Sequence, residues 1–377
     1  MQEREPIPQA RFRELIRAVC DGSYSTADLL AFGEIEDWDV SEIRDFSQAF
    51  AEARTFNRDL SHWDVSKATN MNSMFCYAET FNTSLAGWDV SRVTDMSNMF
   101  SGATAFNQPL AGWDVGRVTD MRGMFSGATT FHQPLGRWNV GRVTDMSTMF
   151  YGAAAFNQPL ESWDVGRVTD MCAMFYGATA FNQPLAGWDV GQVTNMCAMF
   201  CYAGTFHQPL EDWDVSQVTT MSSMFHVARA FNQPLGRWNV GRVTDMNAMF
   251  YGAWTFNQPL AGWDVSRVTN MAEMFYGATA FNQPLEGWDV GQVTNMRNMF
   301  CDAWTFNQPL ERWDVSRVRD MYAMFSRTWT FNQPMGDWTV SCMTQTTAMF
   351  ASARNFDQKK RNRIRRASAR RGPRLRL

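Results

Sequence analysis

The apolar positions of this chain repeat with a fixed period of 25 residues. Counted from its tryptophan as position 1, each copy has apolar residues at positions 1, 3, 6, 9, 12, 13, 16, 19 and 23. A period of this length is typical of a solenoid, in which each coil packs only against its neighbours. We therefore expect one repeat domain over residues 38–358. Its thirteen copies, with no insertion or deletion between them, begin at Trp38, Trp63, Trp88, Trp113, Trp138, Trp163, Trp188, Trp213, Trp238, Trp263, Trp288, Trp313 and Trp338.

Within each copy the pattern predicts a short strand, a short helix and an extended return. The alternation at positions 1 and 3, as in Trp113 and Val115, predicts a strand with one face inward. Position 8 is usually Asp or Asn, as in Asp120, and predicts a helix N-cap before the helical spacing of positions 9, 12, 13 and 16. Glycine at position 15, as in Gly127, can end that helix, and proline at position 22 keeps the return extended.

Stacking these units predicts an α/β repeat solenoid. We expect a right-handed coil with a parallel sheet on the concave side and short helices or helical turns on the convex side. The spacing L-x-x-W-x-V-x-x-V matches the strand pattern of leucine-rich repeats, with Trp and Val in the Leu places. With strands about 4.8 Å apart, thirteen coils would make a sheet about 60 Å long.

Two segments lie outside the repeats. Residues 1–37 are expected to form an N-terminal helical cap, which a solenoid needs because its first core layer would otherwise face water. Phe12, Leu15, Ile16 and Val19 have helical spacing, and Ser25 begins a capping sequence before a second helical segment. Residues 359–377 are expected to be a disordered basic tail.

Charge is distributed unevenly along the chain. The tail has ten Lys and Arg and no acid, so subtracting it from the net charge of −4 leaves −14 on the preceding 358 residues. The tail is a candidate for binding an anionic partner such as nucleic acid, anionic lipid or the acidic body of another copy, or it is incidental. No signal-peptide pattern and no run of 18 apolar residues occurs, so the chain as written predicts an intracellular protein without a transmembrane segment.

The repeat has the sequence W-D-V-S-x-V-T-D-M-x-x-M-F-x-G-A-x-x-F-N-Q-x-L. This motif resembles the BspA-type leucine-rich repeats, also described as a Mycoplasma-type surface repeat. The resemblance covers residues 38–358 and recurs in thirteen copies. It implies a leucine-rich-repeat solenoid that is often found on cell surfaces, with adhesion or partner binding as its role. An extracellular or surface location would require an N-terminus longer than the one given.

Charged columns are the main candidate for a binding surface. Position 2 is Asp in ten copies and position 5 is often Arg, and position 2 should point to the concave face because it lies between two inward positions. Three interpretations are open: a structural Asp–Arg ladder, a charged groove for a protein or glycan partner, and a Ca²⁺ site, which a flat column serves poorly. The candidate partner-binding residues on this face are Asp114, Arg117, Arg142, Asp164, Arg167, Asp189, Arg242, Asp264 and Arg267.

A second candidate is an aromatic patch at position 17, formed by Trp254, Trp304 and Trp329. Exposed aromatic residues often mark partner sites, but these indoles would equally pack over the edge of the predicted helix. Asparagine at position 20 predicts an internal, structural amide ladder, in which stacked side chains satisfy turn backbone groups.

Catalytic and metal chemistry are not indicated by the sequence. The four histidines form neither a triad nor a zinc set, and the Ser and Asp columns repeat equally along the chain, whereas catalysis requires one differentiated site. Cys172 and Cys197 share a repeat position, so a disulfide and two separate thiols are both open. We expect no cofactor and a non-catalytic binding or scaffold protein. The alternative is a nucleic-acid- or membrane-associated protein that is targeted by its tail.

Overall fold

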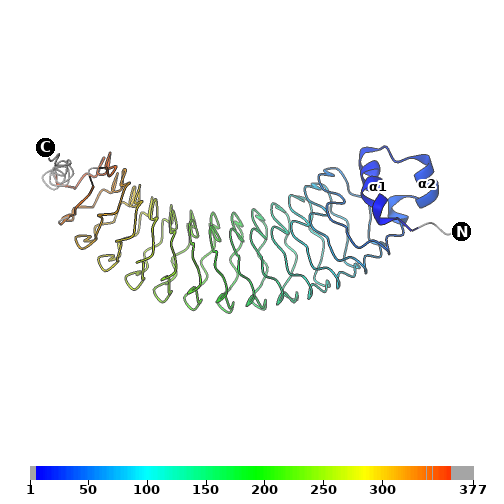
Figure 1. The fold of residues 1–377 in the computed structure, drawn as a ribbon, viewed down its shortest axis with the longest axis horizontal. Coiled ribbons are helices and arrows are strands. Elements are labelled where there is room, and N and C mark those ends of the chain that lie inside the picture. The colour runs from blue at the N-terminus through cyan, green and yellow to red at the C-terminus, as the bar shows by residue number, and fades with distance from the viewer. Residues whose placement is uncertain (1–5, 337, 342, 358–377) are drawn as a thin grey trace, which may run out of the picture. The chain divides into compact units, whose positions relative to one another are not determined.

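The structure is a computed structural model that describes residues 6–336, 338–341 and 343–357. It divides into two compact units, Met1–Gln192 and Val193–Leu377, and in each unit 25-residue coils lie side by side (Figure 1). A repeat solenoid, as predicted from the period, is therefore confirmed. The predicted tail, 359–377, lies outside the described residues.

Three short helices precede the first coil of the first unit (Figure 1): α1 (Gln9–Asp21), α2 (Thr26–Phe32) and the 3₁₀ helix η1 (Ile35–Asp37). They include the segments for which the sequence predicts helix. The Ser25 side chain accepts a hydrogen bond from the Asp28 N–H and so caps α2. On α1, Phe12 is buried and its ring lies 5.1 Å from the ring of Phe46 in the first coil. This contact covers the end of the hydrophobic core.

The first coil has no coil before it, and Gln9 makes some of the backbone hydrogen bonds that a preceding coil makes elsewhere. In later coils the N–H at position 7 donates to the position 7 carbonyl of the preceding coil, as from Thr119 to Thr94 at 2.9 Å. The first coil has no such neighbour, and the N–H groups of Arg44 and Asp45 donate instead to Gln9 Oε1, both at 3.0 Å. Gln9 Nε2 donates in turn to the Asp45 carbonyl. One amide side chain thus satisfies the backbone at this edge.

The core is built from the apolar positions that the sequence identifies. In the Trp113 coil, every residue at an apolar position of the pattern is buried, the first being Trp113 and the last Leu135. Equivalent rings stack between coils, with 6.5 Å between the ring centroids of Trp113 and Trp138. The indole N–H of Trp138 donates to the Leu110 carbonyl at 3.0 Å. The tryptophan column is therefore both apolar and hydrogen-bonded.

The helix predicted at positions 8 to 16 is wrong. In the Trp113 coil this segment forms three overlapping turns, in which Met124, Ser126 and Ala128 each donate an N–H to the carbonyl three residues earlier. Gly123 and Gly127 have φ values of 61° and 69°. A right-handed helix excludes these left-handed residues, whereas a type II turn requires one at its third position.

The reason for the turns is that alternate N–H groups bond to the next coil. Gly123, Phe125 and Gly127 donate to carbonyls of the Trp138 coil at distances of 2.6–2.9 Å. A helix would use the same groups within its own segment. The same four apolar positions face the core in either conformation, so the spacing alone cannot distinguish helix from turns.

The predicted parallel sheet is also wrong for the part of the chain that the structure describes. Pairing is limited to isolated parallel bridges at position 8, such as Asp95 with Asp120 in the first unit and Asp245 with Asn270 in the second. Positions 1 and 3 belong to no strand. The chain turns directly after position 3, where the N–H of Val118 donates to the Val115 carbonyl at 2.9 Å, and this bend ends the extended conformation. The α/β assignment is therefore wrong. The handedness and the concave side stay predictions.

Replacing Thr148 with glycine tests the turns. Thr148, at position 11, has φ 54°, which is unfavourable for a β-branched residue. We expect Thr148→Gly to raise the free energy of unfolding by about 1 kcal/mol, because glycine adopts this conformation without strain. In a helix the same change would instead cost roughly 0.3 kcal/mol, because threonine and glycine are both weak helix formers. Thermal unfolding followed by circular dichroism measures the difference. Thr129→Gly, at a position without positive φ, is the matched control and should destabilise.

Candidate functional site

The Asp column at position 2 is exposed, and its carboxylates bond to the backbone of their own coil. The N–H of Gly116 donates to Asp114 Oδ1 at 3.0 Å, and the N–H of Gly166 donates to Asp164 Oδ1 at 3.1 Å. The same contact recurs at Asp189 and Asp264. An Asp side chain that accepts from the N–H two residues later stabilises a tight turn. These residues therefore have a local structural role.

Hydrogen bonds from serine lower the pKa of Asp264 and Asp214. At Asp264, the side chain and N–H of Ser266 have the largest effect; burial opposes them, and the charge of Arg267 lowers the pKa by a smaller amount. Asp214 has the same arrangement with Ser216, and its pKa is lowered although position 5 of its coil is Gln217. The hydrogen bonds from the turn are thus the main cause of the lowered pKa of these two residues.

The Arg column at position 5 does not pair with the Asp column in the described part of the chain. Arg117, Arg142 and Arg167 are exposed, and no ion pair or side-chain hydrogen bond is found for them among the described residues. Arg242 instead donates to Gln217, the position 5 residue of the coil before. The structural Asp–Arg ladder is therefore not formed. Positions 2 and 5 present two separate columns of opposite charge, and their role in binding stays a prediction.

The three tryptophans at position 17 are the most exposed indoles of the described chain. Trp254, Trp304 and Trp329 have 49%, 42% and 37% of their surface exposed. The rings of Trp304 and Trp329 stack with centroids 4.8 Å apart and planes within 2°. The guanidinium of Arg229 lies 4.4 Å from the Trp254 ring centroid, and that of Arg354 lies 5.1 Å from that of Trp329. All five side chains occupy position 17 of their coils.

The predicted amide ladder at position 20 is present at the surface. The Oδ1 of Asn82 accepts the N–H of Asn107 at 2.9 Å, and Gln108 Nε2 donates to the carbonyl and Oδ1 of the same Asn82. In the second unit Asn232 Oδ1 accepts the N–H of Asn257 in the same way. The structural role of this column is confirmed, but its predicted internal position is wrong, because these asparagines are exposed or half-buried.

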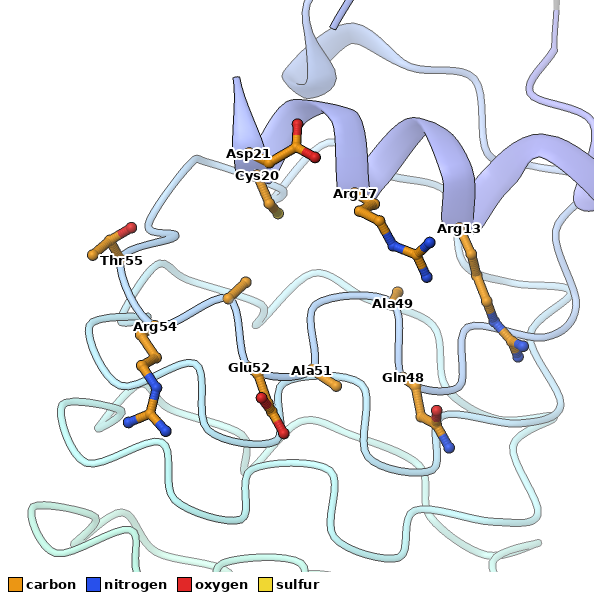
Figure 2. Close-up of a pocket in the computed structure, with 11 residues that line it drawn as sticks. Arg13, Arg17, Cys20, Asp21, Gln48, Ala49, Ala51, Glu52, Arg54 and Thr55 are labelled. Atoms are coloured by element: carbon orange, nitrogen blue, oxygen red, sulfur yellow. The ribbon is translucent and has the colours of Figure 1, made fainter. Parts of the chain in front are cut away.

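A pocket of about 520 Å³ separates α1 from the first coil (Figure 2). Arg13, Arg17 and Cys20 line it from the helix, and Glu52 and Arg54 are among the residues that line it from the coil. Sequence reasoning does not find this pocket, because its size depends on the distance between α1 and the coil. Burial raises the pKa of the Cys20 thiol to about 11, so the thiol is protonated at neutral pH and is a poor nucleophile.

Among the described residues, three backbone carbonyls of the first coil lack the partners that their equivalents have in other coils, and two of them belong to residues that line this pocket. The carbonyls at positions 10, 12 and 14 accept N–H groups of the preceding coil, as Asn72 accepts from Gln48 at 2.8 Å. In the first coil these carbonyls belong to Ser47, Ala49 and Ala51. No hydrogen bond to them is found among the described residues. The pocket therefore offers hydrogen-bond acceptors beside arginine side chains.

His226, in the second unit, is half-buried, and no site predicted from the sequence includes it. Its ring stacks on Tyr251 with centroids 4.4 Å apart, and its Nδ1 is buried without a hydrogen bond in the described part of the chain. Burial lowers the pKa of His226, although the charge of Glu273 acts in the opposite direction. Protonation at this position is therefore unfavourable in the folded protein.

No group of three or more His, Cys, Asp and Glu side chains suited to a metal ion occurs within the described residues. A helix of sufficient length and hydropathy to span a bilayer is likewise not found among them.

Sequence comparison identifies one matching family. Its description is "Mycoplasma protein of unknown function, DUF285", and it matches residues 20–118, 109–208, 184–285 and 254–363. These overlapping matches together span most of the chain. No curated protein matches the sequence.

Several solved structures are similar to the chain at low identity and low TM-score. The crystal structure of a TLR13–ssRNA13 complex has 10% identity and a TM-score of 0.26, with 91% of this chain and 51% of that chain covered. The Toll–Spatzle complex of Drosophila has 9% identity and a TM-score of 0.28, with 76% of this chain and 40% of that chain covered. The leucine-rich repeat domain of APL1 has 9% identity and a TM-score of 0.24, with 72% of this chain and 78% of that chain covered. The chain thus spans about half or less of the length of each of the first two proteins. A likeness this weak says nothing about function.

The half-buried imidazole of His226 predicts a pH-dependent stability. The pKa of His226 is lower in the folded chain than its ordinary value of 6.5, so its contribution is fully present above that value and is lost as the pH falls below it. We expect the unfolding temperature to drop between about pH 7.5 and about pH 5, and His226→Phe to reduce that drop. Calorimetry at both pH values measures it. An identical drop in His226→Phe would show that other groups cause it. His62→Phe, at a histidine outside this column, is the control.

Proposed function

The chain belongs to the Mycoplasma protein family of unknown function DUF285, and we propose that it is a non-catalytic binding or scaffold protein that presents its repeat surface to a protein or glycan partner. Within that family we assign the repeats to the BspA type, because the amino-acid sequence of the 25-residue motif resembles that type. By that resemblance the role is adhesion-like.

The observation that supports this proposal most directly is the arginine column at position 5. Arg117, Arg142 and Arg167 occupy three consecutive coils of the first unit, exposed and without ion pairs among the described residues. The hydrogen bonds between coils fix the backbone from which they project, so these charges are spaced at the coil repeat. An exposed cation without an internal partner is available to a ligand, and a regular row of such cations favours a ligand with repeated acceptors.

The proposal differs from catalysis in what it requires of the chain. A binding surface can use the same group in every coil, whereas an active site needs several different groups at one place. The columns at positions 2 and 5 satisfy the first requirement. Their Asp residues are held by the turn and their Arg residues are not, so we expect the arginines to make most of the contacts with the partner.

Charge reversal of the arginine column tests this role. We expect Arg142→Glu, Arg167→Glu and Arg242→Glu, combined in one chain, to weaken partner binding about tenfold or more, because each replaces an attraction with a repulsion. Binding of the labelled chain to a glycan array and to intact cells measures the loss. A variant with Arg137→Glu, Arg237→Glu and Arg312→Glu has the same net charge but alters position 25. Equal loss in both variants would show that net charge alone controls binding.

Removing the basic tail separates the proposal from its rival. The ten Lys and Arg of residues 359–377 favour a nucleic-acid- or membrane-associated protein if the tail is the binding element. We expect a chain that ends at Gln358 to bind the partner within about twofold of the full chain at physiological salt. Binding to single-stranded RNA or anionic vesicles that is steeply salt-dependent and lost on truncation would instead favour the rival.

A further inference from the structure

Position 17 differs between the two units. In the first unit this column holds small or charged residues, including Thr104, Thr129 and Ala154. In the second unit it becomes a row of flat side chains, interrupted at one residue. From coil to coil this row is Arg229, Trp254, Thr279, Trp304, Trp329 and Arg354.

The flat side chains cover one another on their outer faces. Arg229 belongs to the coil before Trp254 and lies over its ring at 4.4 Å from the centroid. Trp329 belongs to the coil after Trp304 and stacks on it with centroids 4.8 Å apart. Each contact comes from the side away from Thr279. The remaining faces of Trp254 and Trp304 are therefore turned towards each other across Thr279.

These inner faces form a slot, defined by Trp254, Thr279 and Trp304. No ring or guanidinium contact to either inner face is found among the described residues, and both indoles are more than 40% exposed. The two rings belong to coils two repeats apart. Trp304 and Trp329, in adjacent coils, have ring centroids 4.8 Å apart, so two such steps place the centroids of Trp254 and Trp304 about 10 Å apart. The small side chain of Thr279 leaves this space open.

The width of the slot admits a sugar ring. A flat ring centred in the slot would lie at about the 4.8 Å centroid distance at which Trp304 and Trp329 stack, so the width admits a flat ring as well. A pyranose chair is thicker, because its axial hydrogens project from both faces, and carbon contacts of about 4 Å on each side need roughly 9 Å. The polar groups beside the slot therefore decide between the two.

Polar groups at the slot suit a carbohydrate. Thr279 donates its hydroxyl hydrogen to the Trp254 carbonyl at 3.3 Å, which leaves the oxygen lone pairs free to accept from a sugar hydroxyl. Arg229 and Arg354 lie at the two ends of the row, exposed and without an ion pair among the described residues. Stacking covers their guanidinium faces but leaves the N–H edges available to carboxylate or sulfate groups.

We propose that the slot formed by Trp254, Thr279 and Trp304 binds a pyranose ring of an acidic glycan, and that Arg229 and Arg354 bind anionic groups of the neighbouring sugars. This inference rests on the proposed binding function and names its ligand class. It also gives the chain one differentiated position, which the uniform charged columns lack.

A variant in which a side chain fills the slot tests whether a sugar ring binds there. Thr279→Trp places an indole between Trp254 and Trp304, and the coil spacing accepts it because Trp304 and Trp329 already stack in adjacent coils. We expect the full chain to bind hexagalacturonate with saturable quenching of tryptophan fluorescence, and Thr279→Trp to weaken that binding at least about tenfold. Isothermal calorimetry gives the affinity of both chains. Thr129→Trp introduces the same indole at position 17 of the first unit and should bind like the unmodified chain.

The charge requirement is tested with a second variant and a second sugar. We expect Arg229→Gln with Arg354→Gln to weaken hexagalacturonate binding and to reduce its salt dependence. Cellohexaose, a neutral hexamer, should bind the unmodified chain more weakly than hexagalacturonate. Equal affinity for the two hexamers would overturn the assignment to an acidic glycan. No binding of either hexamer, or undiminished binding by Thr279→Trp, would overturn the slot.

The two proposals fail differently in these experiments. If Thr279→Trp binds its partner on the glycan array or on cells as the unmodified chain does, and the triple variant at Arg142, Arg167 and Arg242 does not, then the slot is wrong and the repeat-surface function stands. If neither variant changes any binding, the repeat-surface function is wrong as well.

Discussion

The structure depends on the alternate backbone N–H groups of positions 9 to 15, which bond from one coil to the next. In the Trp113 coil, Gly123, Phe125 and Gly127 donate to the following coil, and the N–H groups between them close turns within the coil. Every coil must therefore present donors and acceptors at the same positions as its neighbours. One inserted residue would exchange the two sets of N–H groups. The absence of insertions and deletions in all thirteen copies follows from this constraint.

The hydrophobic core was predictable from the sequence because burial depends on which positions face inward, whatever backbone brings them there. Trp113, Val115, Met121 and Phe125 are buried as the apolar pattern requires. The helix was not predictable in the same way, because positions 9, 12, 13 and 16 face the core both in a helix and in overlapping turns. The distinguishing feature is the left-handed residue at position 11. It is Gly123 in one coil but Thr148 in the next, and threonine gives no signal for that conformation.

The candidate sites were predictable to different degrees for similar physical reasons. The exposed columns follow from the register, since a residue at a polar position recurs on the same surface in every coil. Reading position 17 in register also finds Arg229 and Arg354 beside the tryptophans, although a search for aromatic residues alone misses them. The pocket under α1 does not follow from the register. Its acceptors are present because Gln9 bonds to the backbone of Arg44 and Asp45, while no hydrogen bond to the carbonyls of Ala49 and Ala51 is found among the described residues.

An acidic ligand on a chain whose first 358 residues sum to −14 requires that local charge outweigh net charge. At physiological salt the Debye length is about 8 Å, so carboxylates several coils away are largely screened from the slot. Arg229 and Arg354 are within reach of the row of indoles and have no internal ion pair among the described residues. By contrast, many acidic side chains are already engaged by their own turns, as Asp264 is by Ser266. The local field at position 17 is therefore set by the arginines, and the net charge acts mainly on the rate of approach at low salt.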